Sequence, residues 1–136
     1  EAEIFPYCRE HDIGVIVRGP LAMGILTGKF HSDSEFPDGD FRRNWQSDPI
    51  QRETFLQDLQ KVEDLMPLAE GRSLAQLALQ FVMDNPAVSV VIPGAKREEQ
   101  LSENVQAAHL PRLTQHEMKQ IDAIVKPGGG RKIWPA

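Results

Sequence analysis

The 136-residue chain has few of the residues that several common kinds of site require. Its single cysteine, Cys8, rules out an internal disulfide and fits a reducing compartment, so we expect a cytoplasmic protein. Its four histidines lack metal-ligand spacing, so we expect no metal site. No apolar run reaches the length of a membrane span, and a formal net charge of −5 disfavours nucleic-acid binding.

The remaining composition is that of one soluble globular domain, with 40% hydrophobic and 26% charged residues. The chain opens with Glu1-Ala2-Glu3, which shows neither a secretory signal nor an initiating Met. We therefore expect a piece of a longer protein. Residues 127–136 contain three consecutive glycines and are expected to form a flexible tail behind one folded unit, residues 1–126.

Hydrophobic periodicity predicts an α/β protein with two short parallel strands and four to five helices. Two short parallel strands leave sheet edges uncovered, so the sheet is expected to be part of a larger one. The expected strands are Ile13–Val17 and Val88–Ile92, each a continuous apolar run typical of a strand covered on both faces. The expected helices cover residues 1–11, 49–69, 74–84, 97–108 and 114–125.

Local signals fix several helix ends. Asp48 before Pro49 predicts an N-cap, and the pairs Ser73 with Gln76 and Thr114 with Glu117 have the spacing of capping boxes. Residues 21–48 show little periodicity and are expected to form a long loop. Its aromatic residues either line a pocket or, as is more common, pin the loop to the core; these are Phe36, Phe41 and Trp45.

The most informative stretch runs from Val88 to Asn104. It predicts a buried strand, a Pro-Gly turn and a helix that opens with Lys96 and Arg97. Cations at the positive end of a helix dipole make sense where an anion is bound, so the stretch indicates a phosphate-bearing ligand. A solvated charged face explains the same pattern about equally well.

The following helix is expected to have a polar and an apolar side. Helical spacing places Gln100, Glu103 and Asn104 on the side of the two cations, where an acceptor beside an amide suits adenine. An apolar stripe is expected to face inward; it consists of Leu101, Val105 and Ala108.

Glycines also follow the first strand. Arg18 ends it, and Gly19-Pro20-Leu21-Ala22-Met23-Gly24 and Thr27-Gly28-Lys29 come next. Glycines there let a backbone approach a phosphate closely, but neither the phosphate-loop motif nor the dinucleotide motif G-x-G-x-x-G occurs. Taken alone, this signal favours an ordinary connection.

Several of these stretches, in order, resemble the C-terminal part of an aldo-keto reductase over residues 1 to about 126. The motifs that carry the resemblance are Tyr7-Cys8-Arg9-Glu10-His11, residues 19–30, residues 36–42, residues 75–79, and Ile92-Pro93-Gly94 leading to Glu103-Asn104. The resemblance implies part of a (β/α)8 barrel, with Ile13–Val17 as strand seven and Val88–Ile92 as strand eight. Barrels commonly bind phosphate after these two strands.

The resemblance also implies NADP(H) as cofactor, bound extended and without a Rossmann motif. The chain alone is expected to bind it weakly, because the nicotinamide half of the pocket lacks its floor. By position, Arg18 packs on the nicotinamide, and Gly19 stands where many members have Ser. The pyrophosphate is covered by Pro20, Leu21, Met23, Gly24 and Lys29. The 2′-phosphate or its ribose is held by Gly94, Lys96 and Gln100, and adenine by Glu103 and Asn104.

Two positions depart from the family pattern. Many members have Lys at the place of Gly94 and Arg at the place of Gln100, which leaves the preference for NADPH over NADH open. Lys96 and Arg97 could substitute for them. Arg42 or Arg43 is expected to close over the cofactor from the long loop.

The catalytic Asp, Tyr, Lys and His of such enzymes belong to the first half of the barrel, and the chain matches none of that half. Tyr7, the only tyrosine, belongs to a helix end and cannot replace the catalytic one. We therefore expect a cofactor-binding fragment of a carbonyl oxidoreductase, inactive alone, whose partner is the N-terminal barrel half or a second copy. The alternatives are a standalone nucleotide-binding or self-associating module and a cofactor-sensing regulatory subunit.

Overall fold

The computed structural model describes residues 2–125, so the expected tail at 127–136 lies outside the described residues. Within them the chain forms two strands, six α-helices and four short 3-10 segments. The elements that the sequence did not predict, which are α2 and the four 3-10 segments, are short. In chain order the elements are α1 (Ile4–Glu10), β1 (Val15–Arg18), η1 (Ala22–Thr27), η2 (Phe41–Arg43), α2 (Asn44–Ser47), α3 (Pro49–Leu65), η3 (Met66–Ala69), α4 (Leu74–Met83), β2 (Val88–Ile92), α5 (Glu98–Gln106), η4 (Ala107–His109) and α6 (Gln115–Ile124).

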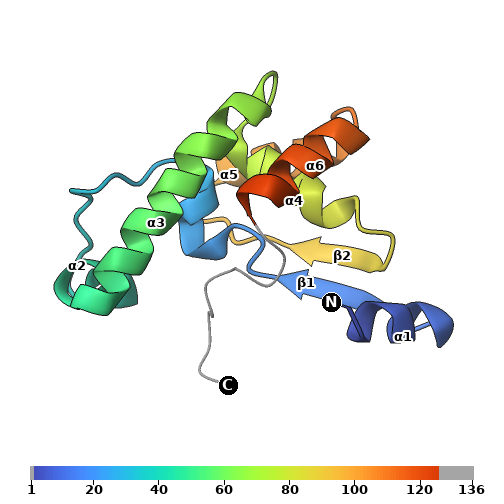
Figure 1. Ribbon diagram of the computed structural model, residues 1–136, viewed down its shortest axis with the longest axis horizontal. Helices are drawn as coiled ribbons and strands as arrows, with labels where there is room; N and C mark the ends of the chain where they lie inside the picture. Colours follow the sequence, from blue (N-terminus) through green and yellow to red (C-terminus); the bar gives the residue numbers. More distant parts are fainter. Residues whose placement is uncertain (1, 126–136) are drawn as a thin grey trace.

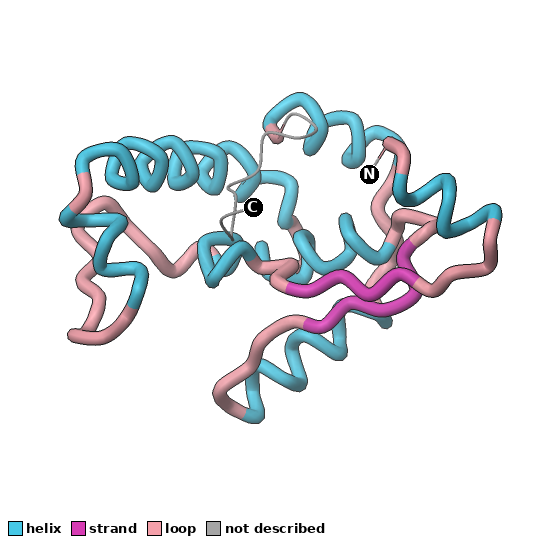
Figure 2. Tube along the Cα trace, turned by 90° about the horizontal axis from the view of Figure 1, so that it is seen from below, coloured by secondary structure: helices cyan, strands magenta, loops and turns pink. Residues whose placement is uncertain are grey.

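The two strands pair in parallel, as expected, with Val15 opposite Val88 and Arg18 opposite Ile92. Figure 1 shows both arrows running the same way, and Figure 2 shows the strands side by side. A parallel pair needs a long crossover, which here contains α2, α3 and α4. Both strands therefore end at the same edge of the sheet, which we call the carboxyl edge.

Helix α4 is the centre of the packing. Leu74 and Leu77 join a core cluster with α3 and α6, while Ala75 and Leu79 join a second cluster with Leu21 and Ala107. Its polar residues are buried too: Gln80 donates to the Pro111 carbonyl at 2.8 Å. Helices α4 and α6 lie above the strands in Figure 1, whereas α3 lies to their left. Since α4 packs against β2, the described chain covers one face of the sheet.

The other face of the sheet is open. Ile16, Val90 and Ile92 are between 48% and 65% exposed, whereas Val15 and Val17 are partly buried. The expectation of strands covered on both faces therefore holds for one face only among residues 2–125. No helix in this part of the chain is long and apolar enough to cross a membrane.

The expected helix signals are confirmed. The Asp48 side chain accepts from the Gln51 amide at 2.9 Å, and both capping boxes, at Ser73 and Thr114, are complete. Helix α3 ends at Leu65, and a 3-10 turn that contains Pro67 follows. The apolar spacing over residues 49–69 predicts an inward stripe of Phe55, Leu59, Val62, Met66 and Ala69. Met66 is wrong, because it is 52% exposed and Leu65 is buried instead.

The long loop is more ordered than expected, because it folds into η1, η2 and α2. Trp45 in α2 is only 2% exposed and packs against Phe55 of α3, with 5.4 Å between ring centroids. Phe36 meets the Trp45 ring edge to face at 5.6 Å. These aromatic residues therefore pin the loop to the core, although Phe41 is 60% exposed.

The expected orientation of α5 is wrong. Leu101 and Val105 are 57% and 55% exposed, and Ala108 is exposed as well. The buried residue is Ala107, and Gln76 of α4 donates to the Glu103 carbonyl at 3.2 Å. The reason is that α5 packs on α4 through its polar side, which leaves its apolar stripe uncovered by residues 2–125.

Candidate functional site

The loops that follow both strands leave the sheet at the carboxyl edge. Arg18 and Ile92 are paired in register there, so the segments beginning at Gly19 and Pro93 start side by side. Gly19 has φ of 66° and turns the chain sharply away from β1. Pro20 and Leu21 are buried and anchor the first loop on α4, while Gly94 is exposed in the second.

The first loop is strained at η1. Ala22 and Met23 have φ of 48° and 57°, a region that costs a residue with a side chain about 1–3 kcal/mol. Gly24 follows at φ 97°, and a Cβ there would lie 3.3 Å from the Phe30 ring. The sequence signal, a glycine after a strand, therefore marks a real conformational requirement at Gly24.

Basic side chains from both loops gather near one place. Burial lowers the pKa of Lys29, and the charges of Arg42, Lys96 and Arg97 lower it further, against an opposing pull from Asp40. Lys29 follows β1, whereas Lys96 and Arg97 follow β2. Such mutual repulsion is relieved when an anion binds among the cations.

The start of α5 differs slightly from expectation. The helix begins at Glu98, so Lys96 and Arg97 lie just before its first turn, and Glu98 and Glu99 occupy that turn. Gln100 is held locally, because its side-chain oxygen accepts from the Lys96 backbone at 2.8 Å. This bond fixes the turn that carries both cations.

Asn104 carries an unsatisfied buried group. Among residues 2–125, its Nδ2 has no hydrogen-bond partner. The neighbouring amide of Gln76 is already used at both ends, by the Ser73 N–H and the Glu103 carbonyl. Buried donors of this kind are rare in native proteins and call for a partner such as a ligand acceptor. The residues thus fit a phosphate-bearing adenine nucleotide.

Arg42 is held by its neighbours. It binds Asp40 through Nε at 2.9 Å and Nη2 at 2.5 Å, and its Nη1 donates to the Met23 carbonyl at 3.2 Å. These hydrogen bonds lower the pKa of Asp40 to about 2. Sequence reasoning missed this contact between η2 and η1; the signal available was Asp40 at the N-cap position of a turn, two residues before Arg42.

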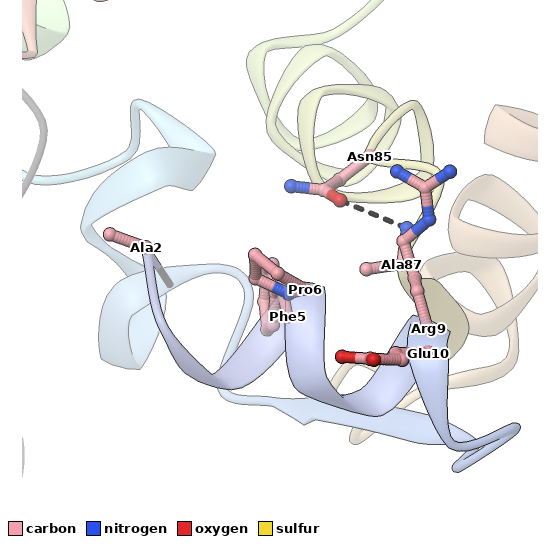
Figure 3. A pocket seen from close by; sticks show the side chains of 7 residues that line it. All are labelled: Ala2, Phe5, Pro6, Arg9, Glu10, Asn85 and Ala87. Atoms are coloured by element: carbon pink, nitrogen blue, oxygen red, sulfur yellow. Dashed lines mark hydrogen bonds between the residues drawn. The ribbon is translucent and has the colours of Figure 1, made fainter.

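An open pocket of about 720 Å³ lies elsewhere, between α1 and the turn before β2. Figure 3 shows its lining from α1, with Asn85 and Ala87 opposite; the dashed line is the 3.0 Å bond from the Ala87 N–H to Asn85 Oδ1. These residues precede the strands, so the pocket is at the edge opposite the loops. None of the cofactor-binding residues predicted from the sequence lines this pocket.

The structure therefore brings together part of the predicted site. Lys29, Lys96 and Arg97 share one electrostatic environment, and Gln100 contacts Lys96. Glu103 and Asn104 lie further along α5, on the side that meets α4. Arg18 is exposed at the end of β1. Within residues 2–125, no group of three or more His, Cys, Asp or Glu is placed to hold a metal ion.

Known proteins with similar sequences and structures are reductases and a related channel subunit. The chain is 36% identical over 129 residues to a probable voltage-gated potassium channel subunit beta of Arabidopsis thaliana, covering 93% of this chain and 39% of the relative. It is 32% identical over 145 residues to aldo-keto reductase yakc of Schizosaccharomyces pombe, whose name includes NADP(+), covering 98% and 42%.

A solved structure has the same fold. The glycerol dehydrogenase AKR11B4 of Gluconobacter oxydans superposes with a TM-score of 0.78 at 32% identity, covering 99% of this chain and 41% of that one. The described elements therefore form part of a (β/α)8 barrel. The chain spans about two fifths of the length of the relatives it matches. The model of the Aldo/keto reductase family matches residues 1–126, and the chain belongs to that family.

Proposed function

We propose that this chain forms the adenosine-phosphate part of an NADP(H) site in an aldo-keto reductase that interconverts a carbonyl compound and an alcohol. The observation that carries the proposal is that the loops after both strands start side by side, because Arg18 is paired with Ile92, and that both loops carry cations. The charges of Lys96 and Arg97 lower the pKa of Lys29, which agrees with this arrangement. The name of the yeast relative, which includes NADP(+), supports the choice of nucleotide.

In this proposal β1 and β2 are barrel strands seven and eight. Lys96 and Arg97 bind the 2′-phosphate, because exposed cations at a helix start attract phosphate. Binding exchanges the exposed ion pair of Arg97 with Glu99, at 3.9 Å, for the phosphate. Lys29, from the loop after β1, binds the pyrophosphate. Adenine lies against α5 at Glu103 and Asn104. The Asn104 Nδ2 is enclosed in the free chain, so its donation to a ring nitrogen of adenine requires the Asn104 side chain to turn outward.

The remaining expected contacts follow the same arrangement. Arg18, at the end of β1, stacks its guanidinium plane on the nicotinamide. When bound, NADP(H) supplies the hydride that is exchanged with a carbonyl carbon. Proton transfer needs the Asp, Tyr, Lys and His that the resemblance assigns to a first barrel half, so we expect no carbonyl reduction by this chain alone.

The partner we propose is that first half of a barrel. Three apolar residues on the open face of the sheet, and two on α5, are about half exposed or more; they are Ile16, Val90, Ile92, Leu101 and Val105. A contiguous barrel would bury such residues, as parallel sheets are normally covered on both faces. A second copy of the chain is the alternative occupant.

Calorimetric titration of the chain with NADP⁺ and NAD⁺ tests the proposal. We expect NADP⁺ to bind about tenfold more tightly, because a hydrogen bond to a charged group contributes about 1.5–3 kcal/mol. Lys96→Gln and Arg97→Gln should remove most of that difference and leave NAD⁺ affinity nearly unchanged.

Lys119→Gln is the matched control, because Lys119 is an exposed lysine on α6. It should alter neither affinity. Equal binding of NADP⁺ and NAD⁺ by the unaltered chain, or equal losses in the Lys96 and Lys119 variants, would contradict the proposed 2′-phosphate site.

A further inference from the structure

We propose that Arg42 is a positioning residue, which holds the strained η1 loop in its phosphate-binding form and is not itself a phosphate ligand. The inference rests on the proposed function for the role of the loop. The structural part, that Arg42 holds η1, can be tested without any nucleotide.

The first step is that η1 needs support from outside itself. Ala22, Met23 and Gly24 have consecutive positive φ angles, which a free loop would rarely populate. Conformations of this kind persist only where surrounding structure over-determines them. Bonds within the loop supply part of this support: the Ala22 N–H bonds to the Gly19 carbonyl at 3.0 Å, the Gly24 N–H to the Leu21 carbonyl at 2.9 Å, and the Thr27 hydroxyl to the Gly24 carbonyl at 2.6 Å. The buried side chains of Leu21 and Ile25 anchor the loop on either side of the strained residues.

The second step is that Arg42 contacts η1 at the strained point. Its Nη1 donates to the carbonyl of Met23 at 3.2 Å, and it lies 3.6 Å from the position a Cβ of Gly24 would occupy. The bond crosses from η2 to η1, so it ties together two parts of the long loop.

The third step is that Arg42 is itself immobilised. Asp40 binds it through two oxygens, and the pair is only 18% exposed on each side. Three rings surround the guanidinium, with centroids 5.3 Å (Phe36), 5.4 Å (Phe30) and 6.0 Å (Phe41) from its carbon. Three of its five N–H donors already bond to protein and Asp40 neutralises its charge, which disfavours a direct role for Arg42 as a phosphate ligand.

Amide hydrogen exchange on the nucleotide-free chain tests the structural part. Arg42→Lys keeps the charge but loses the two-oxygen grip on Asp40, so we expect exchange across residues 22–28 to accelerate about tenfold or more. Asp40→Asn, which leaves Arg42 in place but weakens its anchor, should act in the same direction.

Arg43→Lys is the matched control, because Arg43 is the next residue, is 60% exposed and pairs with the exposed Asp38. It should leave exchange in residues 22–28 unchanged, and peptides from α3 and α4 should stay protected in all three variants. Unchanged exchange of residues 22–28 in Arg42→Lys, with α3 and α4 intact, would overturn the proposal.

Nucleotide titration tests the second part. A positioning residue should affect both nucleotides alike, so Arg42→Lys should weaken NADP⁺ and NAD⁺ by the same factor, about tenfold. Selective loss of NADP⁺ would make Arg42 a ligand of the 2′-phosphate and overturn the proposal. If the unaltered chain binds neither nucleotide, the proposed function fails, while the exchange result still decides whether Arg42 holds η1.

Discussion

Two kinds of residue on the loops and helix after the strands carry the proposed site, cations and one amide. The pKa of Lys29 is lowered by burial and by the charges of Arg42, Lys96 and Arg97, and Asn104 keeps a buried donor without a partner among residues 2–125. Both features cost folding free energy, and a phosphorylated adenine nucleotide would relieve both. Because these two costs in free energy arise at separate points of the carboxyl edge, they favour a single ligand that contacts both points.

The Asp40–Arg42 pair predicts a pH dependence of stability. The pKa of Asp40 falls from its usual 3.8 to about 2, because the folded protein stabilises the ionised carboxylate. The contribution of the Asp40–Arg42 pair to the free energy of unfolding is therefore complete above the unfolded-state pKa of about 4, and it is lost as pH falls through about 2. It amounts to about 2 kcal/mol.

Urea unfolding of Asp40→Asn and the unaltered chain, between pH 6 and pH 2, measures this contribution. The difference in unfolding free energy should shrink toward zero at the acid end. Asp38→Asn is the control, because Asp38 is 91% exposed and should show no such trend. If the difference in unfolding free energy between Asp40→Asn and the unaltered chain stays constant with pH, the ion pair is not the source of the stabilisation.

At the scale of elements, α5 has an orientation that its own amphipathic pattern does not predict. It turns a polar side toward α4, with Asn104 partly buried, and leaves Leu101 and Val105 exposed. An amphipathic helix on a protein surface normally turns its apolar stripe inward. The arrangement makes sense if the apolar stripe meets further barrel elements, because α4 already covers the polar side.

Asn104→Leu tests this interpretation of α5. Leucine has a similar size and removes the unsatisfied donor, so we expect the free energy of unfolding to rise by about 1 kcal/mol. Nucleotide affinity should fall at the same time. Thermal and urea unfolding measure the first effect and calorimetry the second; a loss of stability would mean that the amide has a structural partner.

Local signals predicted the helix ends well, because a cap is made by residues three positions apart. Asp48, Ser73 and Thr114 all cap as the sequence indicates. The left-handed backbone of η1 and the orientation of α5 could not be predicted in this way. They depend on contacts distant in sequence, such as Arg42 with Met23 and Gln76 with Glu103.

The candidate site shows the same division between local signals and contacts distant in sequence. Lys96, Arg97 and Asn104 stand in one short segment, so spacing alone is enough to propose them as one site. The convergence of Lys29 with them required the parallel pairing of β1 and β2, which the strand patterns predicted. The Asp40–Arg42 anchor depends on a turn and three aromatic rings, and no periodicity marks it.

At the scale of the whole molecule, the chain presents two unlike surfaces. One side of the sheet is packed under α4, and the other exposes Ile16, Val90 and Ile92, with Leu101 and Val105 exposed on α5. An apolar surface of this kind normally marks an interface. We expect it to drive self-association when the rest of a barrel is absent.

The double variant Leu101→Glu/Val105→Glu tests this expectation. Both residues are more than half exposed, so the charges should cost little folding free energy while they oppose burial in an interface. Sedimentation velocity should show a shift toward monomer relative to the unaltered chain. Glu substitution at two exposed positions of α3, Gln57 and Gln60, is the control and should not change the distribution.

The most direct test of the central claim is a two-dimensional ¹⁵N–¹H NMR titration of the chain with 2′,5′-ADP, compared with 5′-AMP. We predict that 2′,5′-ADP shifts the Asn104 side-chain amide and the backbone amides of Lys96 and Arg97, and that 5′-AMP shifts the Lys96 and Arg97 amides less. Amides beside the α1 pocket, such as Ala87, should stay unchanged. An unperturbed Asn104 amide, or the largest shifts at the α1 pocket, would contradict the account.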